Sequence, residues 1–310
     1  MVISRMKKVW FWAISLIFVL SFCLYFSEHR LQDSIRGDLI FSDLNGDIAA
    51  VQKITVEHNG RVVTIYNKQD LWRVADADNY YADFNRIHNV LNNIMTAKIG
   101  NEASIENPQN LQWYKLSLFD KQNKILGSAR ISGTLDTNIR YIELSSKIYF
   151  TSWNALLPEQ VVSWTRQPLI AFEGTGISEF IVGDKGIYRN SEGDIFYNTA
   201  DKHRYYHMDY IRIFNTLHDL YYDKVLSSQE FDAEKYADVR TQKLINFDGL
   251  ITELQYVTDY NEYWVKVTLS TTSLPSNAVI DYIKENNIFY QNWWFRLPSD
   301  EGRSLFMFNL

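Results

Sequence analysis

Apolar positions follow two patterns along this chain, an unbroken run near the N-terminus and short periodic stretches after it. The run Val9–Phe26 contains no charged residue, and Arg5, Lys7 and Lys8 precede it. Its eighteen residues, at about 1.5 Å rise each, give about 27 Å of helix, close to the hydrocarbon thickness of a bilayer. The pattern predicts one transmembrane helix over residues 9–26.

Flanking charge predicts the orientation of this helix. Its cations lie on the N-terminal side, whereas the charges just after Phe26 nearly cancel. The positive-inside rule therefore leaves residues 1–8 in the cytoplasm and exports the rest. The alternative is a cleaved signal peptide, which needs a shorter apolar core followed by small residues. The bulky end of the run, Cys23–Phe26, favours an uncleaved anchor.

After a polar tether over residues 27–49, the spacing changes to that of strands and a helix. Apolar and polar side chains alternate on both sides of Asn59–Gly60, which predicts a β-hairpin and a third short strand that carries Trp72 into the core. Asp83 then precedes a helically spaced stretch that extends to about Ile99. Its expected buried face consists of Phe84, Ile87, Leu91 and Ile94.

A similar order of elements recurs about 126 residues later, which indicates an internal repeat. In the hairpin, Val51, Ile54, Val56 and the turn residue Gly60 correspond to Ile177, Phe180, Val182 and Gly186. In the helix, Tyr80, Asp83, Phe84, Arg86, Ile87, Asn89, Leu91, Ile94 and Lys98 correspond to Tyr206, Asp209, Tyr210, Arg212, Ile213, Asn215, Leu217, Leu220 and Lys224. The alternative is a chance likeness between two amphipathic helices that follow hairpins.

Each helix is followed by stretches with strand spacing. They cover residues 114–119, 124–132, 141–144 and 147–150 in the first copy, and 251–257 and 263–270 in the second. Short helices are predicted over 155–164 and 277–285. The expected fold is α+β, with two related units of antiparallel strands, 50–172 and 173–310, each packed with a helix and preceded by the single N-terminal transmembrane helix.

Three segments together resemble the domain-of-unknown-function 4340 family of bacterial membrane-anchored proteins. They are the paired strands before Trp72, the helix after Asp83, and the sequence Trp164–Leu169 that follows a strand ending in Tyr149–Phe150. The likeness covers about residues 50–225. It implies a single-pass envelope protein that accompanies an ABC-type transporter of the gliding-motility-associated kind. It implies no enzymatic activity and brings no catalytic residues.

Composition excludes several classes of function. The chain is 46% hydrophobic and 22% charged, as expected for a folded protein. Its net charge of -6 becomes -9 for the exported part once Arg5, Lys7 and Lys8 are set aside, so nucleic acid is not an expected partner. The single cysteine, Cys23, lies in the apolar run, and the exported part therefore has no disulfide or thiol nucleophile.

Candidate chemical motifs are weak. His203 and His207 stand at i,i+4 with Asp201 and Asp209 nearby, but the stretch lacks the H-E-x-x-H arrangement of a zinc site. The segment Asp43–Asp47 begins like a calcium loop but lacks its glycine and bidentate glutamate, so it is interpreted as a polar turn. The acidic pairs Glu230 with Asp232 and Asp300 with Glu301 are expected to be solvated. No catalytic residue, cofactor or metal is predicted.

Aromatic residues make up 15% of the chain and give the best candidates for contacts. Tyr205–Tyr206 and Trp293–Trp294 place large rings at consecutive positions, and consecutive strand residues face opposite sides of a sheet. One ring of each pair could then be exposed as an anchor for a partner protein or a stacking face for a sugar. The alternative is that both faces are covered.

These patterns predict a protein of the bacterial inner membrane with a periplasmic body. Its expected role is that of a non-catalytic accessory or binding component of a cell-envelope complex, with an ABC-type transporter as the partner suggested by the resemblance. A periplasmic ligand-binding or glycan-binding module is the alternative, and a membrane-anchored hydrolase is a further one.

Overall fold

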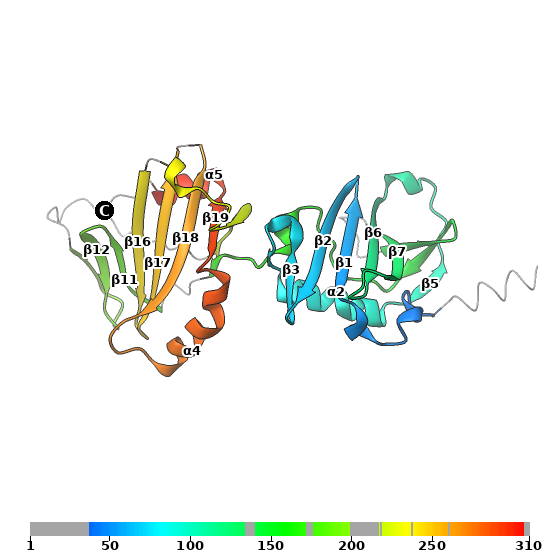
Figure 1. The fold of residues 1–310 in the computed structure, drawn as a ribbon, viewed down its shortest axis with the longest axis horizontal. Helices are drawn as coiled ribbons and strands as arrows, with labels where there is room; N and C mark the ends of the chain where they lie inside the picture. Colours follow the sequence, from blue (N-terminus) through cyan, green and yellow to red (C-terminus); the bar gives the residue numbers. More distant parts are fainter. Residues whose placement is uncertain are drawn as a thin grey trace, which may run out of the picture. The chain divides into compact units, whose positions relative to one another are not determined.

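The computed structural model describes residues 37–133, 140–171, 176–198, 217, 219–236, 238–259 and 261–306 (Figure 1). They form two large antiparallel sheets with few helices, an α+β fold. Contacts between Cα atoms divide the chain into two compact units, residues 1–62 with 85–157 and residues 63–84 with 158–310. The apolar run Val9–Phe26 lies outside the described residues, and within them no helix is both long and apolar enough to cross a bilayer.

The first sheet has the strand order β4-β3-β2-β1-β6-β7-β8-β9-β5. Its strands are β1 (Lys53–His58), β2 (Arg61–Lys68), β3 (Leu71–Val74), β4 (Tyr80–Tyr81), β5 (Ile99–Glu102), β6 (Gln112–Phe119), β7 (Ile125–Gly133), β8 (Arg140–Leu144) and β9 (Lys147–Thr151). Asn59 and Gly60 join β1 to β2 with φ of 49° and 76°, as a tight hairpin turn requires. The predicted hairpin, the third strand and the four later strands are thereby confirmed. Trp72, expected in the core, is only half-buried.

Helix α2 (Phe84–Thr96) buries two of the four predicted side chains, Ile87 and Ile94, and leaves Leu91 half-buried. Ile87, Val90, Asn93 and Ile94 are buried, whereas Phe84 is 78% exposed at the first position of the helix. The expectation for Phe84 was wrong because the buried face of α2 begins one turn later. The backbone leaves the helix at Thr96 and enters β5, so the helix is also shorter than predicted.

Asn93 ties α2 to the segment that follows β9. Its amide nitrogen donates to Oδ1 of Asn154 at 2.8 Å, and its Oδ1 accepts the backbone N–H of Asn154 at 2.7 Å. With 3% of its surface exposed, Asn93 is a buried polar residue that both of these bonds satisfy.

The helix predicted over 155–164 is absent from the described structure; only the 3-10 turn Val161–Trp164 forms there. Trp153 donates its indole N–H to the carbonyl of Ala155, and Trp164 donates to the carbonyl of Pro158. Both indoles are buried. Carbonyls that a helix would use internally are therefore engaged by tryptophan, and Pro158 offers no N–H to a helix.

The second sheet has the order β13-β12-β11-β16-β17-β18-β19-β15, and Figure 1 shows β16, β17 and β18 side by side. Its strands are β11 (Ile177–Val182), β12 (Lys185–Arg189), β13 (Ile195–Asn198), β15 (Lys224–Ser227), β16 (Asp238–Asn246), β17 (Leu250–Thr258), β18 (Tyr263–Thr271) and β19 (Trp293–Leu297). Strands β10 (Ile170–Ala171) and β14 (Asp219–Leu220) form a separate pair.

The turn of the second hairpin differs from the predicted one. Val182 pairs with Lys185, so Gly183 and Asp184 form the turn, and Gly183 has φ of 64°. Gly186, expected as the turn glycine, lies in β12 opposite Ile181. The expected equivalence of Gly60 and Gly186 was therefore wrong, because the second hairpin turns earlier along the chain.

Two helices of the described structure follow β18 in the chain. Helix α4 (Asn277–Asn286) begins after Ser276, whose hydroxyl accepts the N–H of Val279, and it confirms the predicted helix. Helix α5 (Ser299–Phe306) packs on β18 through Gly302. A Cβ at Gly302 would lie 2.4 Å from the Cβ of Tyr263, so only glycine allows this close approach.

Candidate functional site

Trp293 and Trp294, the predicted contact residues, are consecutive on β19, which lies between β18 and β15. Both are buried, with 7% and 5% of their surface exposed. Trp293 packs edge-on against Tyr80, which belongs to the same compact unit, with ring centroids 4.9 Å apart. Trp294 contacts a different set of rings. Both faces of β19 are therefore covered at these positions. The other predicted contact residues, Tyr205 and Tyr206, lie outside the described residues.

Trp294 belongs to an aromatic cluster on the outer face of the second sheet, opposite the face that carries α5. The cluster consists of Phe231, Val257, Trp264 and Trp294. Phe231 stacks on Trp294 with centroids 4.4 Å apart and leans on Trp264 at 4.9 Å. Tyr236 stacks on the other side of Phe231. The segment that carries Phe231 and Tyr236 thus covers both tryptophans.

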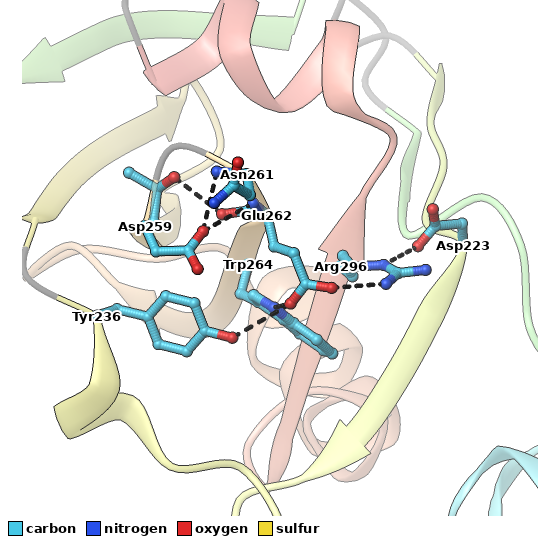
Figure 2. Close-up of polar contacts among 8 residues, drawn as sticks. Asp223, Tyr236, Asp259, Asn261, Glu262, Trp264 and Arg296 are labelled. Atoms are coloured by element: carbon cyan, nitrogen blue, oxygen red, sulfur yellow. Dashed lines mark hydrogen bonds and ion pairs between the residues drawn. The ribbon is translucent and has the colours of Figure 1, made fainter.

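A carboxylate lies at the edge of this cluster. Glu262, in the turn between β17 and β18, directs its side chain toward Trp264, Tyr236 and Arg296 (Figure 2). Its Oε2 accepts the indole N–H of Trp264 at 3.1 Å and the hydroxyl of Tyr236 at 3.4 Å. Its Oε1 accepts from Nη1 of Arg296 at 2.8 Å. One carboxylate thereby joins the turn, the covering segment and β19.

Two further acids complete the network in Figure 2. Asp223 accepts from Nε of Arg296 at 2.6 Å, so the guanidinium bridges two carboxylates. Asp259 accepts the backbone N–H groups of Asn261 and Glu262 at 2.9 and 3.0 Å and thereby shapes the turn. The site is therefore a set of charged side chains held in place by hydrogen bonds at the end of the second sheet.

The electrostatics of the network favour the ionised acids. Partial burial would raise the pKa of Glu262, but hydrogen bonds from Trp264 and Arg296, with the charges of Arg296 and Lys224, hold it below its usual range. Backbone hydrogen bonds from Glu262 and Asn261 lower the pKa of Asp259. Desolvation and the neighbouring carboxylates raise the pKa of the Tyr236 hydroxyl. At neutral pH, the network thus holds Glu262 as an anion whose two oxygens accept from three side chains.

A second feature of this unit is a groove of about 750 Å³ beside β16. It lies between the turn of the β11–β12 hairpin and the first residues of β16. The side chains that line it are Ile181, Val182, Asp184, Lys185, Val239, Arg240, Thr241 and Lys243, together with Gly183. Three of these residues are cationic and one is anionic. The groove is therefore lined by both basic and apolar side chains.

The remaining predicted residues do not converge in the described structure. His203, His207, Asp201 and Asp209 lie outside the described residues. In the range Asp43–Asp47, the carboxylate of Asp47 accepts the N–H of Ala50 in a local turn. Asp232 pairs with Lys235 at 3.4 Å, and Asp300 and Glu301 occupy the first turn of α5. Among the residues that the structure describes, no group of three potential ligands could hold a metal ion.

Sequence reasoning missed both features of the second sheet. The alternation Glu262-Tyr263-Trp264 places the glutamate and the indole on one side of a strand, which was a usable signal. The signal for the groove is weaker. The predicted match of Gly60 with Gly186 gave the two hairpins equal length, whereas the second one turns earlier, at Gly183–Asp184.

Comparison of the chain with protein-family models, with curated proteins and with solved structures gave no match in any of the three.

Proposed function

We propose that this protein is anchored in the bacterial inner membrane by Val9–Phe26 and that its exported body binds other proteins of a cell-envelope complex without catalysing a reaction. The observation that carries the proposal is the uncharged eighteen-residue run with Arg5, Lys7 and Lys8 before it. Anchoring raises the effective concentration of the body toward membrane neighbours, so a modest interface is sufficient for binding.

The resemblance to the domain-of-unknown-function 4340 family supplies the partner class, an ABC-type transporter. The basic groove beside β16 supplies a surface of suitable chemistry for a protein ligand. The alternative function, glycan binding, requires exposed rings on which a sugar can stack, and Trp293 and Trp294 were the candidates. Both rings are buried, so these residues give that alternative no support.

We also infer that the body consists of two related units, over about residues 50–172 and 173–310. The supporting observation is the strand order. In the first sheet, β3-β2-β1-β6-β7-β8-β9-β5 repeats position by position as β13-β12-β11-β16-β17-β18-β19-β15 in the second. The registers agree as well. Val56 pairs with Leu116 in the first sheet, and the residues 126 positions after them, Val182 and Gln242, pair with each other in the second.

Fractionation of cells that express the intact chain tests the anchor. We expect the protein to stay in the membrane pellet after alkaline carbonate extraction, and a C-terminal tag to be digested by protease added to spheroplasts. A mature chain that starts after Phe26 and is released on lysis would contradict the proposal. Purification in mild detergent should then recover transporter subunits, and their absence would remove that partner.

A further inference from the structure

The groove beside β16 exists because β16 extends beyond its neighbour. Pairing between β11 and β16 ends at Val182 and Gln242. Strand β16 begins four residues earlier, at Asp238, and over 238–241 its register partners among the described residues all belong to β17. Among the described residues, no strand pairs with this edge of β16 where the groove lies.

The first sheet fills the equivalent place. Beyond the pair Val56 and Leu116, β1 continues through Glu57, which pairs with Lys115, to His58. Nδ1 of His58 lies 2.8 Å from the carbonyl oxygen of Trp113, and its ring stacks on Tyr114 at 4.4 Å. The corresponding strand of the second hairpin ends two residues earlier, at the equivalent of Val56. Each strand of the β11–β12 hairpin is thus two residues shorter than its counterpart in the β1–β2 hairpin. The groove occupies the place that these residues would fill.

Backbone groups of β16 point into this space. Oγ of Ser178 donates to the carbonyl of Ile245 at 2.9 Å, so that carbonyl faces β11. Alternate residues of a strand direct their N–H and C=O to the same side, and the register with β17 is continuous from Asp238 to Ile245. Val239 and Thr241 therefore present their N–H and C=O groups to the groove. Such an open edge is the template for an added strand.

Charge around the groove selects the incoming strand. Lys185, Arg240 and Lys243 line it with one acid, Asp184. Arg240 donates to the carbonyl of Phe306 at 2.6 Å, which positions its guanidinium without neutralising it. Lys243 also pairs with Glu253 at 3.0 Å, where both side chains are partly exposed. The side chains that line the groove thus include three cations and one acid, on a body whose exported charge is negative. This lining favours acidic side chains in a ligand.

We propose that an extended acidic segment of a partner protein adds to the open edge of β16 as a further strand. The segment bonds to the backbone of Val239 and Thr241, and its carboxylates lie toward Lys185 and Arg240. The inference rests on the proposed function, in which the body binds proteins of an envelope complex, and it names the surface and the chemistry of the bound segment.

Peptide binding to the full chain in mild detergent tests the proposal. The probe is fluorescein-labelled acetyl-Thr-Val-Glu-Val-Thr-amide, followed by fluorescence anisotropy. We expect the Lys-centred analogue, and an analogue N-methylated on the backbone, each to bind at least about tenfold more weakly, because the first reverses the charge and the second removes a ladder donor. Hydrogen exchange at the amides of Val239 and Thr241 should slow when the acidic peptide binds.

A matched pair of variants locates the site. Replacing Gly183–Asp184 with the six residues 57–62 of the first hairpin should fill the groove and abolish binding. The control replaces the same two residues with Asn-Gly, which keeps the hairpin length and should bind normally. Lys185→Glu should weaken binding of the acidic peptide by about tenfold and should strengthen binding of the Lys-centred peptide.

Several outcomes would overturn the inference. Equal binding of the acidic, basic and N-methylated peptides would exclude strand addition, and undiminished binding by the lengthened hairpin would exclude this site. A concentration-dependent dimer abolished by the lengthened hairpin would assign the groove to a second copy of the chain. If the lengthened variant still recovers the membrane complex, the inference fails while the proposed function stands; release of the chain from the membrane would instead contradict the proposed function.

Discussion

The indole N–H of Trp264 donates to Oε2 of Glu262 at 3.1 Å, although the two residues are only two positions apart. Alternation along an extended strand places both side chains on one face. The carboxylate of Glu262 therefore lies beside the indole edge of the buried Trp264. It also accepts hydrogen bonds from Arg296 and Tyr236. Glu262, a single turn residue, thus links the residues at the edge of the outer aromatic cluster.

Substitution of Glu262→Ala should lower the free energy of unfolding by about 1 kcal/mol, because charge-assisted bonds to a partly exposed carboxylate contribute at the low end of their range. Urea denaturation monitored by tryptophan fluorescence measures the change. Glu230→Ala is the control, since Glu230 is an exposed acid of the same compact unit. Equal effects of the two substitutions would show that the network does not stabilise the fold.

The effect of Glu262→Ala should depend on pH. The folded pKa of Glu262 lies below its usual value of 4.5, so its stabilisation is complete above the unfolded pKa and is lost as pH falls through the folded pKa. The difference between wild type and variant should therefore be full at pH 7 and should shrink below about pH 4. A difference that stays constant down to pH 2 would contradict this assignment.

Gly302→Ala should loosen α5 from β18. The added Cβ would lie 2.4 Å from the Cβ of Tyr263, within van der Waals overlap, so the helix must shift. We expect a loss of about 1–3 kcal/mol. Glu301→Ala, at the exposed neighbouring position of α5, should change stability by less than about 0.5 kcal/mol. Thermal unfolding of the two variants checks the contrast.

Two adjacent asparagines on α2 should respond differently to substitution. Asn93→Ala removes the two bonds to Asn154, whose backbone N–H and side-chain oxygen lose those partners, at a cost of about 1 kcal/mol. Asn92 has an exposed side chain, and Asn92→Ala should be neutral or slightly stabilising because alanine favours helix. Chemical denaturation of both variants gives the comparison.

Phe231→Ala should uncover the outer tryptophans. Loss of the ring that packs on Trp264 and Trp294 should cost about 3 kcal/mol and should shift tryptophan emission to longer wavelength. Phe247→Ala removes a ring that is 50% exposed and should leave the emission unchanged. An unshifted spectrum for Phe231→Ala would mean that the covering segment does not depend on this contact.

Strands with a clean two-residue period were predictable, and strands with mixed burial were not. The hairpin around Asn59–Gly60 was predicted because polar and apolar side chains alternate through it. Strand β16 was missed because Gln242 occupies an inward position, where it is fully buried and bonds to the carbonyl of Leu305. The bounds of β19 were not predicted because both of its faces are buried, which produces the continuous run Trp293–Phe295 without alternation.

The location of the aromatic residues was only half predictable. Alternation correctly gives Trp293 and Trp294 different neighbours, since consecutive residues face opposite sides of β19. Whether those sides are exposed depends on Phe231 and Tyr80, which are distant in sequence. No local pattern reports such a contact. The groove depends in the same way on a hairpin length that becomes visible only when two registers are compared.

Placement of β19 between β18 and β15 sets an order of events during synthesis. Strand β15 emerges about seventy residues before Trp293, and among the described strands its sheet partner is β19. The ribosome must therefore release β19 before β15 can join the sheet, and a chain truncated ahead of Trp293 would leave two strand edges exposed to other nascent chains. The same constraint governs β5, which waits for β9 in the first sheet.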